Sequence, residues 1–80
     1  MGSIEERAKK VIARELGCDM EELRNNRISL VDLGMDELAR PGLVMALEEE
    51  FEAEITDEVG DSFTIVQDVI DAVTPSRSRD

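Results

Sequence analysis

Apolar residues recur at helical spacing in three stretches of the chain. The first stretch follows Ser3, a favourable helix cap, and ends before Gly17, while the other two cover residues 43–51 and 65–73. The periodic positions are Ile4, Ala8, Val11, Ile12 and Leu16, then Leu43, Leu47 and Phe51, and finally Ile65, Val66, Val69, Ile70 and Val73. We therefore predict three amphipathic helices, the last capped by Thr64.

The segments between these helices contain only short apolar runs. Residues 19–23 are predicted to form one short turn, and a second is predicted near residues 58–59. The long segment before the second helix is predicted to be an ordered loop, because scattered aliphatic side chains can anchor it to the core. These anchors are Ile28, Leu30 and Leu33.

The composition fits a small helical domain and excludes most enzyme chemistries. Of the 80 residues, 41% are hydrophobic, and the only aromatic residues are two phenylalanines, so the interior should be aliphatic. Without histidine and with Cys18 alone, the chain has no Cys/His zinc cluster, no histidine-based triad and no intramolecular disulfide. No EF-hand spacing is present either. We expect no catalytic residues, no metal site and no enzyme activity.

The charge balance restricts the kind of partner. Twenty acidic and nine basic residues give a net charge of −11 at pH 7, which repels nucleic-acid phosphates and anionic lipids and attracts basic protein surfaces. The same charge favours a monomer. No apolar run approaches the roughly 20 residues of a membrane span, and the charged N-terminus does not resemble a secretory signal. We expect a cytoplasmic protein that binds neither nucleic acid nor membranes.

One domain is predicted over residues 4–73, which contain all the periodic segments. Residues 1–3 are expected to be a cloning-vector remnant or a disordered N-terminus. Residues 74–80 contain Pro75 and no large apolar side chain, which predicts a flexible tail.

One heptapeptide carries a family resemblance. The run Asp32-Leu33-Gly34-Met35-Asp36-Glu37-Leu38 resembles the D-L-G-x-D-S-L signature of acyl carrier proteins. Similarity to bacterial fatty-acid-synthesis carriers continues in Ile4-Glu5-Glu6-Arg7, Lys9-Lys10, Glu21-Glu22, Asn25-Asn26 and the segment from Leu43 to Phe51. The resemblance implies an all-α, acyl-carrier-protein-like four-helix bundle, with a long loop between helices one and two and a short third helix.

Glu37 occupies the position of the phosphopantetheine-bearing serine in that signature, flanked by Asp36 and Leu38. A carboxylate lacks the hydroxyl nucleophile that attack on coenzyme A requires, so we expect no phosphopantetheine and no other cofactor. Three interpretations of the glutamate are open. The protein has lost the modification, or a serine was replaced deliberately, or Glu37 supplies a permanent negative charge that mimics the phosphodiester. Attachment at Ser29 or Ser62 is a less favoured alternative, because neither has the Asp-Ser-Leu context.

The second helix is predicted to begin at Pro41. If Asp36 were its cap, Pro41 would lie inside the helix, where its ring would clash with the carbonyl of Glu37 at a cost of about 3 kcal/mol. Because proline is favourable at the first helical position, a shortened or kinked helix is expected instead.

The resemblance also implies a docking surface. In carrier proteins the second helix presents an acidic ridge to basic patches on the enzymes of acyl metabolism. Arg40 is expected to add positive charge at one end of this ridge and to redirect partner specificity. The predicted partner-binding residues are Glu37, Arg40, Leu43, Val44, Met45, Glu48, Glu49 and Glu52.

The predicted function is that of a non-catalytic protein-binding or regulatory module toward enzymes of fatty-acid, polyketide or other acyl metabolism. The alternative is a genuine acyl carrier, with its arm attached elsewhere or its serine removed. A weaker alternative is noncovalent lipid binding in the bundle interior. Thioester carriage on Cys18 is disfavoured, because neighbouring carboxylates should raise the pKa of its thiol.

Overall fold

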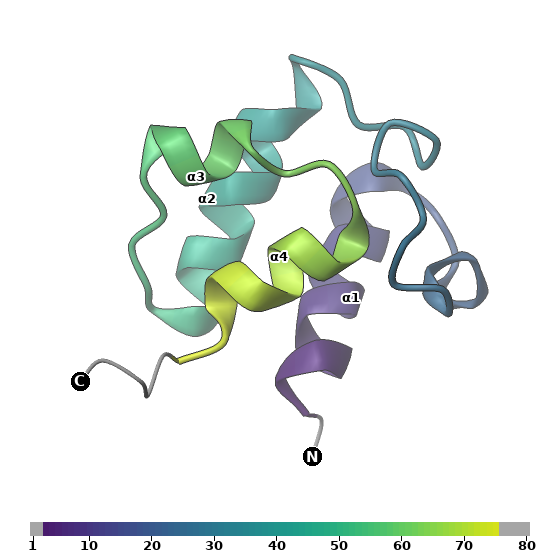
Figure 1. The fold of residues 1–80 in the computed structure, drawn as a ribbon, viewed down its shortest axis with the longest axis horizontal. Coiled ribbons are helices and arrows are strands. Elements are labelled where there is room, and N and C mark those ends of the chain that lie inside the picture. Colours follow the sequence, from purple (N-terminus) through teal and green to yellow (C-terminus); the bar gives the residue numbers. More distant parts are fainter. Residues whose placement is uncertain (1–2, 76–80) are drawn as a thin grey trace.

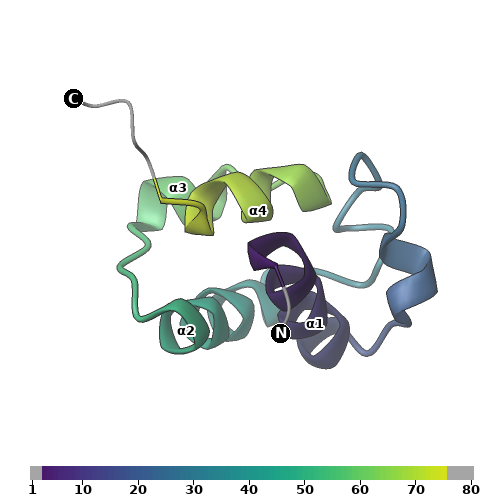
Figure 2. The ribbon, with the colours of Figure 1, turned by 90° about the horizontal axis from the view of Figure 1, so that it is seen from below.

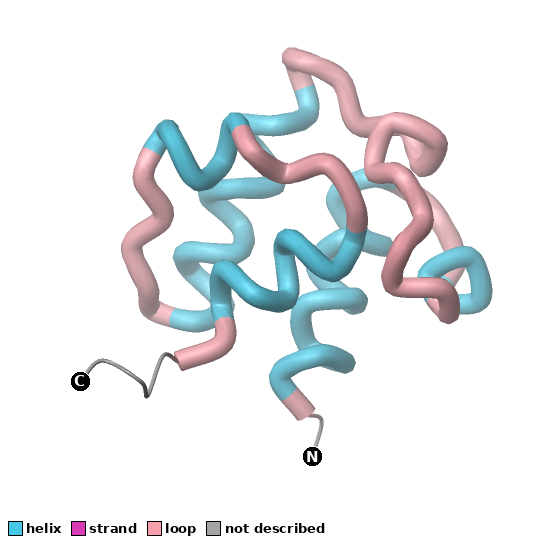
Figure 3. The backbone as a smooth tube through the Cα atoms, in the orientation of Figure 1, coloured by secondary structure: helices cyan, strands magenta, loops and turns pink. Residues whose placement is uncertain are grey.

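The computed structural model describes residues 3–75 and contains helices but no named strand within that range (Figure 1). The elements are α1 (Ile4–Leu16), the short 3₁₀ helix η1 (Met20–Leu23), α2 (Ala39–Phe51), α3 (Asp57–Asp61) and α4 (Val66–Val73). In Figure 2, α1 and α2 form one layer, and α3 and α4 form a second layer above them. The predicted all-α bundle with a long loop and a short third helix is confirmed (Figure 3). The predictions made for residues 1–2 and 76–80 lie outside the described residues.

The first helix has the ends that its sequence predicts. The Ser3 hydroxyl accepts a hydrogen bond from the Glu6 N–H at 3.0 Å, which satisfies one of the free donors of the first turn. At the other end, Gly17 adopts a left-handed conformation with φ 71°, and its N–H donates to the Ala13 carbonyl at 2.9 Å.

An arginine joins the start of α1 to the end of α2. Arg7 donates from Nε to the Glu50 carboxylate at 3.0 Å and from Nη2 to the Glu50 carbonyl at 2.9 Å. The same guanidinium lies 4.7 Å from the centre of the Phe51 ring. Glu50 therefore contributes to packing between the two helices, and its carboxylate faces α1.

The loop before α2 is ordered because the backbone anchors it to the start of α4. The Leu30 N–H donates to the Thr64 carbonyl at 2.9 Å, and the Val66 N–H donates to the Ile28 carbonyl at 3.2 Å. An isolated antiparallel bridge pairs Ser29 with Ile65 between these bonds. The aliphatic anchors predicted from the sequence are confirmed, since Leu30 and Leu33 are buried and Ile28 packs against the core.

The helices and the loop share one aliphatic core. Phe63 is its only buried aromatic residue within the described range, and Phe51 is half-buried. The buried set comprises Ala8, Val11, Ile12, Leu23, Leu30, Leu33, Met35, Leu43, Leu47, Ile55, Phe63, Val66, Val69, Ile70 and Val73. Within residues 3–75, no helix is long and apolar enough to cross a membrane.

The prediction that the second helix begins at Pro41 is wrong. α2 runs without a break from Ala39 to Phe51, and the Arg40 N–H donates to the Asp36 carbonyl at 2.9 Å. Pro41 is accommodated because it lies in the first turn, where most N–H groups lack a helical partner anyway. Residues 37–38 form a turn, so the regular helix still starts after Asp36, but earlier than predicted.

The prediction that Thr64 caps the last helix is also wrong. α4 begins at Val66, with Ile65 in the cap position. The Thr64 hydroxyl donates to the Ser62 carbonyl at 3.2 Å instead of accepting from the helix. The carboxylate of Asp68 reaches back to accept from the N–H groups of Thr64 and Ile65, at 3.0 and 3.1 Å, and fixes the entry of the chain into α4.

Candidate functional site

The turn that leads into α2 presents residue 37 at the surface. The Asp36 carboxylate accepts hydrogen bonds from the N–H groups of Leu38 and Ala39, at 3.1 and 2.8 Å, and so fixes the turn. Glu37 is exposed, and Leu38 is 90% exposed. Asp36 thus acts as the capping side chain of α2, and a carboxylate and an apolar side chain project from the loop that it orders.

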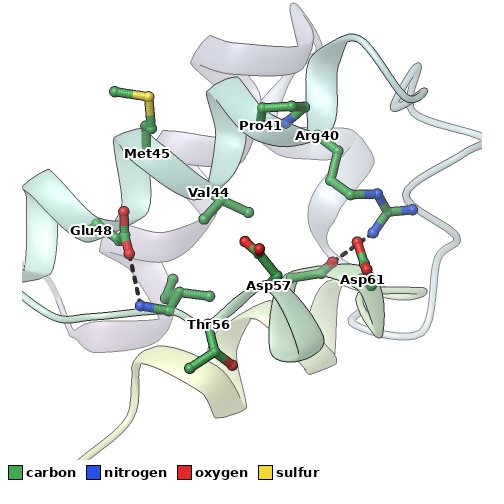
Figure 4. Close-up of a pocket in the computed structure, with 10 residues that line it drawn as sticks. Arg40, Pro41, Val44, Met45, Glu48, Thr56, Asp57 and Asp61 are labelled. Carbon is green, nitrogen blue, oxygen red and sulfur yellow. Dashed lines mark hydrogen bonds between the residues drawn. The ribbon is translucent and has the colours of Figure 1, made fainter.

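A cleft of about 300 Å³ lies between α2 and α3 (Figure 4). Arg40, Val44 and Glu48 are spaced by four residues and therefore share one face of α2. In Figure 4 all three side chains point toward α3. The lining residues are Arg40, Pro41, Val44, Met45, Glu48, Ile55, Thr56, Asp57, Gly60 and Asp61. The cleft therefore combines an apolar wall from α2 with carboxylates from both helices.

Two side chains of α2 cross this cleft. The Arg40 guanidinium donates from Nη1 to the Gly60 carbonyl at 2.6 Å and lies 3.5 Å from the Phe63 carbonyl oxygen. The Glu48 carboxylate accepts from the Ile55 N–H at 2.8 Å. Both side chains are half-buried, and these hydrogen bonds hold α2 to the segment that contains α3.

Some predicted partner-binding residues of α2 lie on the surface. Met45 is 60% exposed, and Glu49 and Glu52 are exposed. Glu52 has a φ of 50°, and its N–H donates to the Glu48 carbonyl, so it ends α2 in a left-handed conformation. With Glu37, three carboxylates and one flexible apolar side chain from this part of the chain are thus exposed to solvent.

Other predicted partner-binding residues have a different role. The assignment of Leu43 to a contact surface is wrong, because Leu43 is completely buried in the core and no partner can reach it. Val44 is half-buried in the wall of the cleft. Arg40 is directed toward backbone carbonyls at the end of α3, so the structure does not place it as a free positive charge on the ridge.

The side chains considered for attachment elsewhere make local hydrogen bonds. The Ser29 hydroxyl accepts from the Val31 N–H at 3.2 Å, and the Ser62 hydroxyl donates to the Val59 carbonyl at 2.7 Å. Burial raises the pKa of the Cys18 thiol, and the negative charge of Glu22 raises it further. The thiolate form is thereby disfavoured at this position.

The α3 side of the cleft was missed by sequence reasoning. Gly60 is conspicuous, because a Cβ built there would lie 3.1 Å from Val44 Cγ2, so a glycine allows the two helices to approach closely. One sequence signal for the cleft was available: Arg40, Val44 and Glu48 are spaced by four residues and therefore share one face of α2. Within residues 3–75, no group of three or more acidic or cysteine side chains is arranged to hold a metal ion.

The chain matches a known protein family. A family model described as the phosphopantetheine attachment site matches residues 6–73. The matched range extends from the first turn of α1 to the last residue of α4, and it includes the loop, the turn at residue 37 and the cleft.

Proposed function

Because the chain belongs to the phosphopantetheine-attachment family, which includes the acyl carrier proteins, we propose that it is an acyl-carrier-like module without an attached arm. In this proposal it acts as a non-catalytic binding or regulatory domain for enzymes of fatty-acid, polyketide or other acyl metabolism. Carrier domains of this family interact with enzymes and are generally not catalysts themselves.

The observation that carries the proposal is the glutamate at residue 37. It lies on an exposed turn directly after the Asp36 cap, where the family signature has its serine. A phosphodiester to the arm needs a hydroxyl oxygen, and a carboxylate does not supply one, so residue 37 does not fit the group. The local bonds of Ser29 and Ser62 offer no support for attachment there.

The second part of the proposal concerns the docking surface. Glu37, Met45, Glu49 and Glu52 are accessible and lie along α2 and the turn before it. Their negative charge complements basic patches on partner enzymes, and such complementarity raises association rates and selects partners. The net charge of −11 supports a monomeric module that binds these patches transiently.

The first test is the intact mass of the protein before and after incubation with coenzyme A and a broad-specificity phosphopantetheinyl transferase. The unaltered protein, Glu37→Ser and Glu37→Ala are compared. We expect a mass gain in Glu37→Ser alone, because that variant supplies the missing hydroxyl on an unchanged turn. A gain in the unaltered protein would overturn the proposal and favour a genuine carrier with attachment elsewhere. A gain in none of the three proteins would contradict the assignment of residue 37 as the attachment position.

The second test uses the same transferase as a model partner. In the Glu37→Ser background, Glu49→Lys with Glu52→Lys should slow modification strongly, since it reverses the charge of the proposed docking surface. The matched control is Glu21→Lys with Glu22→Lys, which changes the net charge equally on η1. Equal slowing by both pairs would mean that net charge, and not a surface on α2, governs docking.

A further inference from the structure

One stripe of α2 faces α3 and has a polar side chain at each end. Arg40, Val44 and Glu48 are spaced by four residues, so they lie on one helix face over about 12 Å. Val44 meets Gly60 in the middle, while Arg40 and Glu48 bind backbone groups at the two ends of the facing segment. α2 therefore meets this segment through one small apolar contact, with a polar contact on each side of it.

The helix that receives these contacts is weak on its own. α3 has five residues, far below the length at which an isolated helix is stable in water. Its only buried residue is Gly60, and its largest apolar side chain, Val59, is 39% exposed. The flanking Ile55 and Phe63 are buried, so they anchor the segment at its two ends but not along α3 itself.

Arg40 adds a charged donor at the end of α3. The Gly60 carbonyl accepts the Phe63 N–H at 3.3 Å, a long backbone hydrogen bond, and the Arg40 guanidinium adds a shorter bond to the same oxygen at 2.6 Å. Within residues 3–75, none of the ion pairs includes Arg40, and its guanidinium is bound to this carbonyl instead. Hydrogen bonds from charged donors are among the stronger ones in proteins.

From these contacts we propose that Arg40 is a positioning residue that holds the end of α3 against α2. By doing so it fixes the distance between α2 and α3 and therefore the shape of the cleft between them. Loss of the guanidinium releases α3 into local opening while the remaining helices stay packed. The inference concerns the free protein and does not depend on the proposed function; only its consequence, that docking enzymes meet a cleft of fixed shape, rests on that function.

The experiment is amide hydrogen exchange of the full chain, measured residue by residue by NMR. Arg40→Met removes the donor and keeps the aliphatic stem, and Arg40→Lys restores a positive charge with a single donor group. The reporting amides are those of Gly60, Ser62 and Phe63, whose N–H groups bond within the α3 segment. The matched control is Arg14→Met, since Arg14 is an exposed arginine whose Nε lies 3.5 Å from the adjacent Glu15 carboxylate.

We expect exchange at the amides of Gly60, Ser62 and Phe63 to be about tenfold faster in Arg40→Met, with a smaller increase in Arg40→Lys. Exchange in α1 and α4 should be unchanged, and Arg14→Met should match the unaltered protein throughout. Unchanged α3 exchange in Arg40→Met would overturn the proposal. An equal increase in α1, α3 and α4 would also overturn it, because that result reports a general loss of stability. Failure of the transferase tests leaves these outcomes unaffected, because no partner is present in the exchange measurement.

Discussion

Asp36 illustrates how one short side chain can order the turn at the start of a helix. Its carboxylate accepts two backbone N–H groups, and its carbonyl accepts a third from Arg40. Asp36 thus accepts three N–H groups just ahead of Pro41, which itself has no N–H to donate. The exposed side chains of Glu37 and Leu38 are presented by this ordered turn.

At this scale we predict that Asp36→Ala lowers the free energy of unfolding by about 1 kcal/mol, the usual effect of removing a capping oxygen. Asp36→Asn should retain most of the stability, because its amide oxygen can accept the same bonds. Urea denaturation with an unchanged m value measures the difference. Asp32→Ala, an exposed carboxylate in the same loop, serves as the control and should have little effect. Equal losses from Asp32→Ala and Asp36→Ala would refute a specific capping role.

At the level of elements, hydrophobic periodicity predicted the helices because buried aliphatic residues decide where helices pack. The turn at residues 19–23 and the end of α1 at Gly17 followed from the same pattern and from backbone preference. The starts of α2 and α4 were mispredicted. Asp36 was rejected as the cap of α2 because of Pro41, yet its carboxylate accepts from Leu38 and Ala39; at α4, Asp68 accepts from the N–H groups of Thr64 and Ile65, which precede the helix. The α3 side of the candidate site was missed. The spacing of Arg40, Val44 and Glu48 indicated one face of α2, but the group that Arg40 binds is a backbone carbonyl, which a side-chain pattern does not identify.

Two glycines of the helices should respond to the same substitution in opposite directions. Gly17 has a φ of 71° and open space around its Cα, so Gly17→Ala should cost about 1 kcal/mol through backbone strain alone. Gly42 lies inside α2, where an added Cβ would meet Glu15 Oε1 at an ordinary 3.7 Å, so Gly42→Ala should stabilise by about 0.5–1 kcal/mol. Thermal unfolding of both variants, measured in parallel, tests these two predictions. A shift of both melting temperatures in the same direction would contradict this account of the helix backbone.

For the whole molecule, the dominant property is the excess of negative charge in a small volume. The Cα radius of gyration is 11.7 Å, and the net charge is −11. At about 10 mM salt the Debye length is about 30 Å, so the carboxylates of the whole domain repel one another. At about 1 M salt the Debye length falls to about 3 Å, and only neighbouring charges still interact. Folding brings the charges together, so the native state gains more from screening than the extended chain does.

We therefore predict that the urea midpoint at pH 7 rises as NaCl increases from about 10 mM to about 1 M. Glu22→Gln with Glu49→Gln removes two exposed negative charges, so the double variant should be more stable at low salt and gain less from added salt. KCl should act like NaCl, because the effect depends on ionic strength and not on a bound cation. A midpoint that falls or stays constant with salt would show that the ion pairs, such as that of Arg7 with Glu50, outweigh the repulsion. In that case the acidic surface of α2 would be balanced within the domain, and its attraction for basic partners would be correspondingly weaker.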